Sequence, residues 1–172
     1  MLKILSIILV VFALGFYFYR NQDLKLKAGD KAPGFSLQDS NGKVYSLAEY
    51  KGKSPVIVYF YPKAGTSGCT KEACGIRDNW SKFSQNGIQV LGVSVDSKSE
   101  IKKFVDDYKL NFPLLSDNDK SVSKKYGVLG ISGFDRRITF IVDKNSKIAD
   151  VIEVKDIANH ADMIFQKALA LK

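Results

Sequence analysis

The chain has 172 residues, of which 45 % are hydrophobic and 26 % are charged, so it can form one globular domain and leaves no room for a second catalytic domain. Lysine and arginine outnumber aspartate and glutamate by 26 to 18, which gives a formal net charge of +8. We interpret this excess as lysines scattered over a solvated surface and expect no nucleic-acid partner. Two cysteines and one histidine cannot supply the four ligands of a closed structural zinc site, so we expect no metal and no cofactor.

An uncharged apolar run covers residues 4–19. It is slightly short of the roughly 20 residues that span a bilayer and long for the core of a signal peptide. We expect residues 1–20 to form a retained membrane anchor, because the aromatic residues 16–19 suit a membrane interface; a cleaved signal segment and a buried helix are the alternatives. This predicts a membrane-anchored, single-pass protein whose domain lies outside the cytoplasm in preference to inside it.

After a polar tether at residues 21–33, residues 28–172 alternate between strand-like and helix-like patterns. Residues 35–38 and 44–47 flank Asn41-Gly42, a dipeptide that favours a tight hairpin turn. Unbroken apolar runs predict buried strands at 56–61, 89–95 and 138–142, followed by a last strand at 148–154. Apolar residues at helical spacing predict helices within 69–83, 101–108 and 157–168. This order predicts an α/β, thioredoxin-like fold, in which a central mixed sheet has helices on both faces and a hydrophobic helix precedes it.

The segment between the strand at 56–61 and the helix that follows carries the chemistry. Cys69 falls in the first helical turn, where backbone N–H groups without an intrahelical partner favour a negatively charged sulfur. The thiolate is the nucleophilic form of cysteine, so Cys69 is a candidate nucleophile, with an inert buried cysteine as the alternative. Thr66 offers a hydroxyl three residues earlier, and we expect Pro62 to limit the access of solvent.

Cys69 and Cys74 are five residues apart. In a regular helix this spacing places their Cα atoms roughly 8 to 9 Å apart, whereas a disulfide requires less than about 7 Å. A permanent structural disulfide is therefore disfavoured, and any pairing of these two cysteines requires the first turns of the helix to unwind.

The motif Pro62-x-x-x-Thr66-x-x-Cys69 resembles the active-site signature of peroxiredoxins. The run at residues 68–74 is similar to that of the Q subfamily, also called the bacterioferritin comigratory protein type. The similarity extends from about residue 28 to the C-terminus, and Ser67 stands where many members have proline. The apolar run at the N-terminus lies outside the family domain.

This resemblance implies a thiol peroxidase that serves antioxidant defence and reduces hydrogen peroxide and organic hydroperoxides. Cys69 would become a sulfenic acid and condense with Cys74 to an intramolecular disulfide, which thioredoxin or a similar dithiol would reduce. Arg137 matches the active-site arginine of the family, with its neighbour Arg136 as the alternative, and Thr66 would orient the peroxide. An intramolecular partner for Cys69 favours a monomer.

Two other functions stay open on the sequence alone. The chain could act as a redox sensor or disulfide carrier, or as a non-catalytic, membrane-attached binding module with a thioredoxin fold. Among the remaining residues, Glu72 matches a family position and is expected to bond nearby backbone or Arg137. We expect Trp80 in the core, and His160 in contact with solvent because polar residues surround it in the sequence.

Overall fold

The structure, a computed structural model, describes residues 24–172. Within these residues seven strands form one mixed sheet in the order β2-β1-β5-β4-β3-β6-β7. Their bounds are β1 (Ser36–Asp39), β2 (Val44–Ser46), β3 (Val56–Phe60), β4 (Gln89–Ser94), β5 (Leu114–Ser116), β6 (Ile138–Val142) and β7 (Ile148–Glu153). The three central strands β5, β4 and β3 are parallel to one another, and the remaining neighbours are antiparallel.

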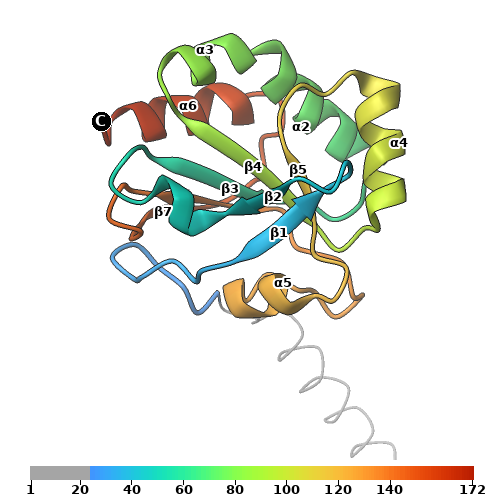
Figure 1. Cartoon of the computed structure of the whole chain (residues 1–172), viewed down its shortest axis with the longest axis horizontal. Helices are drawn as coiled ribbons and strands as arrows, with labels where there is room; N and C mark the ends of the chain where they lie inside the picture. Colours follow the sequence, from blue (N-terminus) through green and yellow to red (C-terminus); the bar gives the residue numbers. More distant parts are fainter. Residues whose placement is uncertain (1–23) are drawn as a thin grey trace, which may run out of the picture.

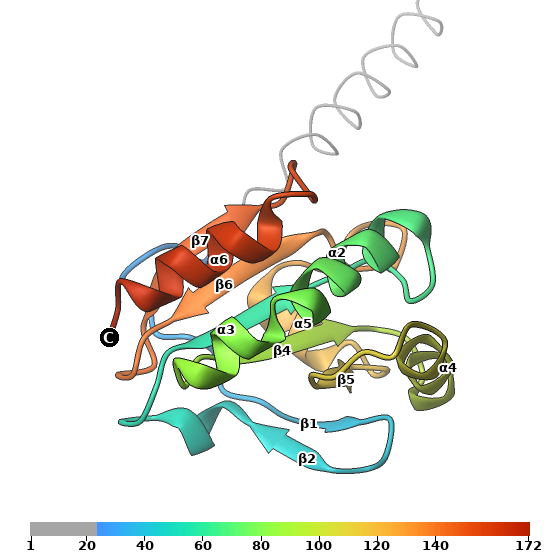
Figure 2. The same cartoon turned by 90° about the horizontal axis from the view of Figure 1, so that it is seen from above.

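Helices cover both faces of this sheet, as the sequence predicts. They are α2 (Ser67–Asp78), α3 (Trp80–Gln85), α4 (Lys98–Tyr108), α5 (Ser121–Tyr126) and α6 (His160–Leu169), with a short 3-10 helix, η1 (Leu47–Tyr50), after β2. Figure 1 shows α2, α3 and α6 above the sheet and α5 below it. In Figure 2, α6 runs beside α2 and β6, which brings the last helix close to the helix that contains both cysteines.

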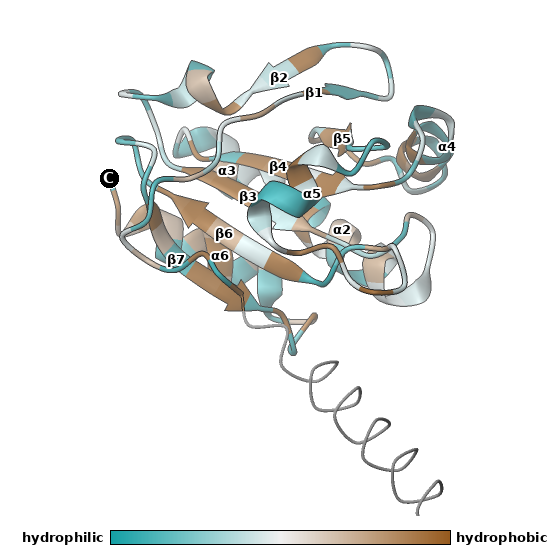
Figure 3. Ribbon diagram, turned by 90° about the horizontal axis from the view of Figure 1, so that it is seen from below, coloured by the Kyte–Doolittle hydropathy of each residue, from teal (hydrophilic) through white to brown (hydrophobic). Residues whose placement is uncertain are grey.

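Strand β3 is buried on both faces because it lies between two hydrophobic clusters. Ile57 and Tyr59 belong to the cluster beneath α2, α3, α4 and α6, whereas Val56, Val58 and Phe60 belong to the cluster on the α5 side. Consecutive strand residues point to opposite faces, so the unbroken apolar run satisfies both clusters. Figure 3 shows the same hydrophobic character along most of β6, the antiparallel neighbour of β3.

The structure differs from the sequence prediction at three places. In the hairpin, Gly42 has φ +85° but Asn41 keeps a negative φ, and the Asp39 side chain closes the turn by accepting from the backbone N–H groups of Asn41 and Lys43. The single helix expected within 69–83 is divided at Asn79 into α2 and α3. The short elements β5 and α5 were not predicted, because three to six residues carry little periodic signal.

Residues 24–33, in the predicted tether, lie against the domain. Leu24 and Leu26 pack on the α5-side cluster. The backbone N–H of Gly29 donates to Ile148 O at 2.8 Å, and that of Ala32 donates to Ser146 O at 2.9 Å. These contacts tie the start of the described chain to the edge of the sheet at β7.

The prediction of a membrane-anchored, single-pass protein is wrong for the part of the chain that is described. Within residues 24–172, no helix has the length and apolar character needed to cross a membrane. The apolar run at 4–19, on which the anchor, the N-terminal hydrophobic helix and the membrane contact were based, lies outside the described residues. We therefore retain neither the prediction of a membrane anchor nor the prediction that the domain lies on a particular side of a membrane.

Candidate active site

The loop between β3 and α2 is held by a buried carboxylate. Asp96, which follows β4, accepts from the backbone N–H of Ala64 at 2.8 Å and from Lys63 Nζ at 3.0 Å. Lys63 also reaches Glu100 in the first turn of α4 at 2.9 Å. Because β3 and β4 are parallel neighbours, their C-terminal ends meet at one edge of the sheet, and this edge fixes the entry into α2.

Cys69 lies in the first turn of α2, as the sequence predicts, and is 1 % exposed. Arg137, the residue that precedes β6, donates a hydrogen bond from Nη2 to the sulfur at 3.2 Å. Burial alone would lower the pKa of Arg137, but the nearby Glu72 carboxylate and the Cys69 sulfur raise it above its usual value. The guanidinium therefore stays charged beside the sulfur, which favours an anionic sulfur or an anionic reaction intermediate there.

Gly68 leaves space for this contact. A Cβ atom at Gly68 would lie 3.2 Å from Arg137 Nη2 and 3.5 Å from Ile157 Cδ1. The first distance is tighter than ordinary van der Waals contact, so a side chain at position 68 would press on the guanidinium. The glycine before Cys69 thus leaves room for the guanidinium of Arg137, the residue before β6.

A second group of polar side chains lies behind the arginine. Arg137 Nη1 forms an ion pair with Glu72 Oε2, while Glu72 Oε1 lies 3.0 Å from His160 Nδ1. His160 Nε2 in turn lies 2.9 Å from Thr139 Oγ1. The side chains of Glu72 and His160 are 0 % and 1 % exposed, so both are removed from water.

The prediction that His160 contacts solvent is therefore wrong. His160 begins α6, and residues 160, 164 and 168 share one face of that helix; Ile164 and Ala168 are also buried. This spacing of four residues was the available signal in the sequence. Polar neighbours in the sequence obscured it, because they lie on other faces of the same helix.

Cys74 lies on α2 and Thr66 is the residue before this helix, and neither has a described contact with the sulfur of Cys69. Cys74 is half-buried, and both cysteines are free thiols. Thr66 is exposed, and its hydroxyl donates to the carbonyl oxygen of Lys63 at 2.9 Å. That hydroxyl oxygen retains lone pairs that can accept from a bound substrate.

Pro62 and Arg136 complete the residues named from the sequence. Pro62 is half-buried in the loop after β3. Arg136 Nη2 lies 3.5 Å from Glu153 Oε1 at the end of β7, so the structure brings Arg137, and not Arg136, to the cysteine sulfur. Trp80 is partly buried, and its ring stacks on that of Phe112 with centroids 5.9 Å apart.

Two other buried ionisable side chains, Tyr59 and Asp135, belong to the segments that build the site. Burial raises the pKa of Tyr59 well above its usual value, so the phenol stays neutral beside the arginine and glutamate. Burial also raises the pKa of Asp135 to about 7, and the carboxylates of Asp117 and Asp96 add to the rise, while Ser123 and Lys120 oppose it. Asp135 lies two residues before Arg137, on the segment that delivers the arginine.

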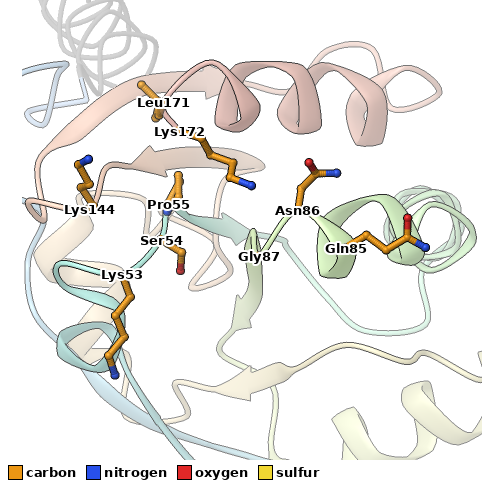
Figure 4. Close-up of a pocket in the computed structure, with 9 residues that line it drawn as sticks. All are labelled: Lys53, Ser54, Pro55, Gln85, Asn86, Gly87, Lys144, Leu171 and Lys172. Carbon is orange, nitrogen blue, oxygen red and sulfur yellow. The ribbon is translucent and has the colours of Figure 1, made fainter.

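A pocket at the other end of the sheet does not include the cysteine. Figure 4 shows three lysines, Lys53, Lys144 and Lys172, around Ser54 and Pro55, just before β3 begins. Cys69 instead follows the C-terminal end of β3. The pocket therefore belongs to the edge of the sheet opposite the site described above.

Sequence comparison relates the chain to known proteins over most of its length. Residues 28–151 match the AhpC/TSA family. The chain is 42 % identical over 146 residues to peroxiredoxin Bcp of Escherichia coli strain K12, an alignment that covers 81 % of this chain and 93 % of the relative. It is 46 % identical over 132 residues to a putative peroxiredoxin of Mycobacterium tuberculosis, with 72 % and 83 % covered.

Structure comparison agrees with these matches. The structure of peroxidoxin BcpB from Mycobacterium tuberculosis superposes with a TM-score of 0.78 at 34 % identity, covering 86 % of this chain and 99 % of that one. A structure of the bacterioferritin comigratory protein of Xanthomonas campestris, described with regard to its alkyl peroxide reduction activity, gives a TM-score of 0.75 at 26 % identity, with 86 % and 98 % covered. The fold is therefore the thioredoxin-like fold in its peroxiredoxin form.

Proposed function

From the premise that this chain belongs to the AhpC/TSA family and is a peroxiredoxin, a thioredoxin-dependent thiol peroxidase, we propose how its residues perform the reaction. Membership of a family of peroxidases does not favour the two alternatives, a redox sensor or disulfide carrier and a non-catalytic binding module. The observation that carries the assignment of residues is the contact between the Arg137 guanidinium and the Cys69 sulfur.

Cys69 is the nucleophile. Its thiolate attacks the terminal oxygen of a hydroperoxide, the O–O bond breaks, and that oxygen stays on sulfur as a sulfenic acid. The rest of the hydroperoxide takes up a proton and leaves as water or an alcohol. The free N–H groups of the first turn of α2 and the charged guanidinium favour the negative charge that moves from sulfur to the leaving oxygen.

Arg137 and Thr66 position the substrate. The guanidinium presents several donors in a rigid plane, which can contact the sulfur and a peroxide oxygen together. The Thr66 hydroxyl stands at the start of α2 and can accept the peroxide hydrogen. Pro62 shields one side of the loop from solvent. Holding the O–O bond in line with the sulfur accelerates the attack, because the reacting atoms are already oriented.

Cys74 resolves the sulfenic acid. Its thiolate attacks the sulfur of Cys69, the S–O bond breaks, and water leaves once the oxygen is protonated. Both cysteines lie on the one helix α2, at a spacing too long for a disulfide in a regular helix. Helix α2 must therefore open during each turnover, a conformational step of the kind that gates many enzymes.

A dithiol of the thioredoxin type then attacks the disulfide and restores both thiols by exchange. Because the resolving thiol comes from the same chain, a monomer completes the cycle. We extend the substrates to hydrogen peroxide as well as organic hydroperoxides, because the two side chains that would bind the substrate, Arg137 and Thr66, would contact only the peroxide group that both share.

Peptide mapping by mass spectrometry tests this assignment. After treatment with one equivalent of hydrogen peroxide, the wild-type chain should contain a Cys69–Cys74 disulfide. Cys74→Ser should stop at a sulfenic acid on Cys69, which dimedone traps. A sulfenic acid on Cys74 in Cys69→Ser, formed as fast as that on Cys69, would overturn the assignment of the nucleophile.

A further inference from the structure

Five side chains form a continuous series of contacts that starts at the cysteine, and all of them except the partly buried Arg137 are buried. Cys69 and Glu72 come from α2, Arg137 and Thr139 from the strand β6 and the residue before it, and His160 from α6. The contacts run from the cysteine sulfur through the guanidinium and the carboxylate to the imidazole, and end at the threonine hydroxyl. Neither the attack on peroxide nor the resolving step uses the imidazole directly.

The carboxylate of Glu72 depends on the imidazole. A buried carboxylate is costly unless its oxygens have polar partners. Arg137 pairs with Oε2. Within residues 24–172 Oε1 forms no hydrogen bond of regular geometry, although His160 Nδ1 lies 3.0 Å away. Nδ1 likewise forms no hydrogen bond in that part of the chain, so each of the two buried atoms has the other as a polar neighbour that a small adjustment would turn into a hydrogen bond. Loss of the imidazole would remove the polar atom that lies 3.0 Å from Oε1, so the carboxylate would no longer be held on that side.

The chemistry of the contact fixes where one hydrogen must be. An ionised carboxylate can only accept hydrogen bonds, so Nδ1 must carry hydrogen to stabilise Glu72. The Thr139 hydroxyl can either donate to Nε2 or accept from it, and so it holds the ring in place without dictating its charge. The groups that face the imidazole are the Glu72 carboxylate from α2, the Thr139 hydroxyl from β6 and the Tyr59 ring from β3, whose centroid is 6.3 Å away.

We propose that His160 is a positioning residue for peroxide reduction: its Nδ1–H holds the carboxylate of Glu72, which in turn fixes Arg137 against the sulfur of Cys69. This inference rests on the proposed function of the site. It also couples the imidazole to the redox state, because Glu72 lies between Cys69 and Cys74. Opening α2 to form the disulfide moves that carboxylate away from the imidazole.

The wild-type protein allows a direct test, because His160 is the single histidine of the chain. Labelling histidine with ¹⁵N gives one imidazole in the NMR spectrum, without interference from other residues. In the reduced protein at neutral pH, Nδ1 should show the resonance of a protonated ring nitrogen. Its frequency should change when the Cys69–Cys74 disulfide forms. An unprotonated Nδ1 in the reduced protein, or a spectrum unchanged by oxidation, would overturn the proposal.

Two variants separate positioning from packing. His160→Leu fills the space but offers no donor, and it should slow the reaction of Cys69 with hydrogen peroxide by about tenfold, as expected for an unpaired buried carboxylate. His160→Asn places an amide N–H near the position of Nδ1 and should stay within about threefold of wild type. In a Glu72→Gln background, His160→Leu should cost less than about twofold further, because the residue through which it acts is already changed.

The outcomes distinguish this inference from the proposed function. If wild type does not consume peroxide through Cys69, the function itself fails. If wild type does so but His160→Leu reacts as fast, or His160→Asn is as slow as His160→Leu, only the role of His160 fails. Circular dichroism of each variant identifies any that is unfolded, in which case the NMR experiment on wild type decides.

Discussion

Arg137 Nη2 lies 3.2 Å from the sulfur of Cys69, although the two residues are 68 positions apart in the chain. The contact exists because β3 and β6 are antiparallel neighbours. The end of β3 that leads into the cysteine helix therefore lies beside the start of β6. The sheet thus brings together the cysteine that we propose as the nucleophile and a cation from a distant segment of the chain.

Replacing Arg137 should remove most of the peroxidase activity. Arg137→Gln loses the charge beside the sulfur, and we expect the second-order rate constant for hydrogen peroxide to fall by about 100-fold. Arg136→Gln is the matched control, because Arg136 pairs with Glu153 instead, and its rate should stay within about threefold. Competition kinetics with a peroxide indicator measures both. A larger loss in Arg136→Gln than in Arg137→Gln would contradict the assignment.

Adding a methyl group at Gly68 should act on the same contact. The new Cβ would stand 3.2 Å from Arg137 Nη2, so Gly68→Ala should displace the guanidinium and slow peroxide reduction by about tenfold. Gly75→Ala lies in the same helix, where the new Cβ would meet only Ala161 Cβ at an ordinary 3.9 Å. That control should keep its activity and gain about 0.5–1 kcal/mol of stability from helix propensity. Equal rates in the two variants would show that position 68 has no such role.

Formation of the disulfide should open the start of α2 and leave the rest of the fold intact. The spacing of Cys69 and Cys74 in a regular helix exceeds the reach of a disulfide. We therefore expect backbone amides of Ser67–Asp78 to exchange hydrogen faster in the oxidised protein than in the reduced one. Amides of α4 (Lys98–Tyr108) serve as the internal control and should not change. Unaltered exchange in α2 on oxidation would show that the disulfide forms without unwinding.

Asp135 should make stability depend on pH. Its pKa is raised from 3.8 to about 7 in the folded protein, so between these values the folded state holds a proton that the unfolded state releases. The free energy of unfolding therefore falls as the pH rises from about 4 to about 7 and does not recover above that range. The side chain of Asp135→Asn cannot ionise, so this variant does not lose that part of the free energy of unfolding as the pH rises.

Urea denaturation at pH 5 and pH 8 measures the effect. The stability of Asp135→Asn relative to wild type should rise between the two pH values by on the order of 1–3 kcal/mol. Comparing the variant with wild type removes the contributions of the other titrating groups. An identical difference at both pH values would mean that Asp135 is already ionised in the folded protein at pH 5.

The central strands and the cysteine helix could be predicted because their signals are local. The run at 56–60 is apolar without interruption. The position of Cys69 in the first turn of α2 follows from the helical pattern of the residues after it and does not depend on the rest of the fold. Contacts between distant segments carry no such signal. The resemblance to a family, and not the spacing of residues, indicated Arg137, and the partner of Glu72 on α6 could not be inferred from either segment alone.

The failures have similar physical causes. His160 has polar neighbours in the sequence, yet the face of α6 that packs on β6 determines its burial. The helix after Cys69 is interrupted at Asn79, whose side chain donates to the carbonyl oxygen of Gly75 at 2.9 Å and competes with the next helical turn. Apolar spacing on both sides of Asn79 is unaffected, so the pattern predicted one helix where the backbone makes two.

Rapid mixing of the reduced protein with less than one equivalent of hydrogen peroxide tests the central claim most directly. Trp80, two residues beyond α2, serves as the fluorescent probe, while residual peroxide is measured in parallel. The wild-type chain should consume the peroxide quickly. Cys74→Ser should do so for a single turnover, and Cys69→Ser should show no consumption above the buffer rate. If Cys69→Ser consumed peroxide as fast as the wild-type chain, this would contradict the proposal that Cys69 is the peroxidatic sulfur.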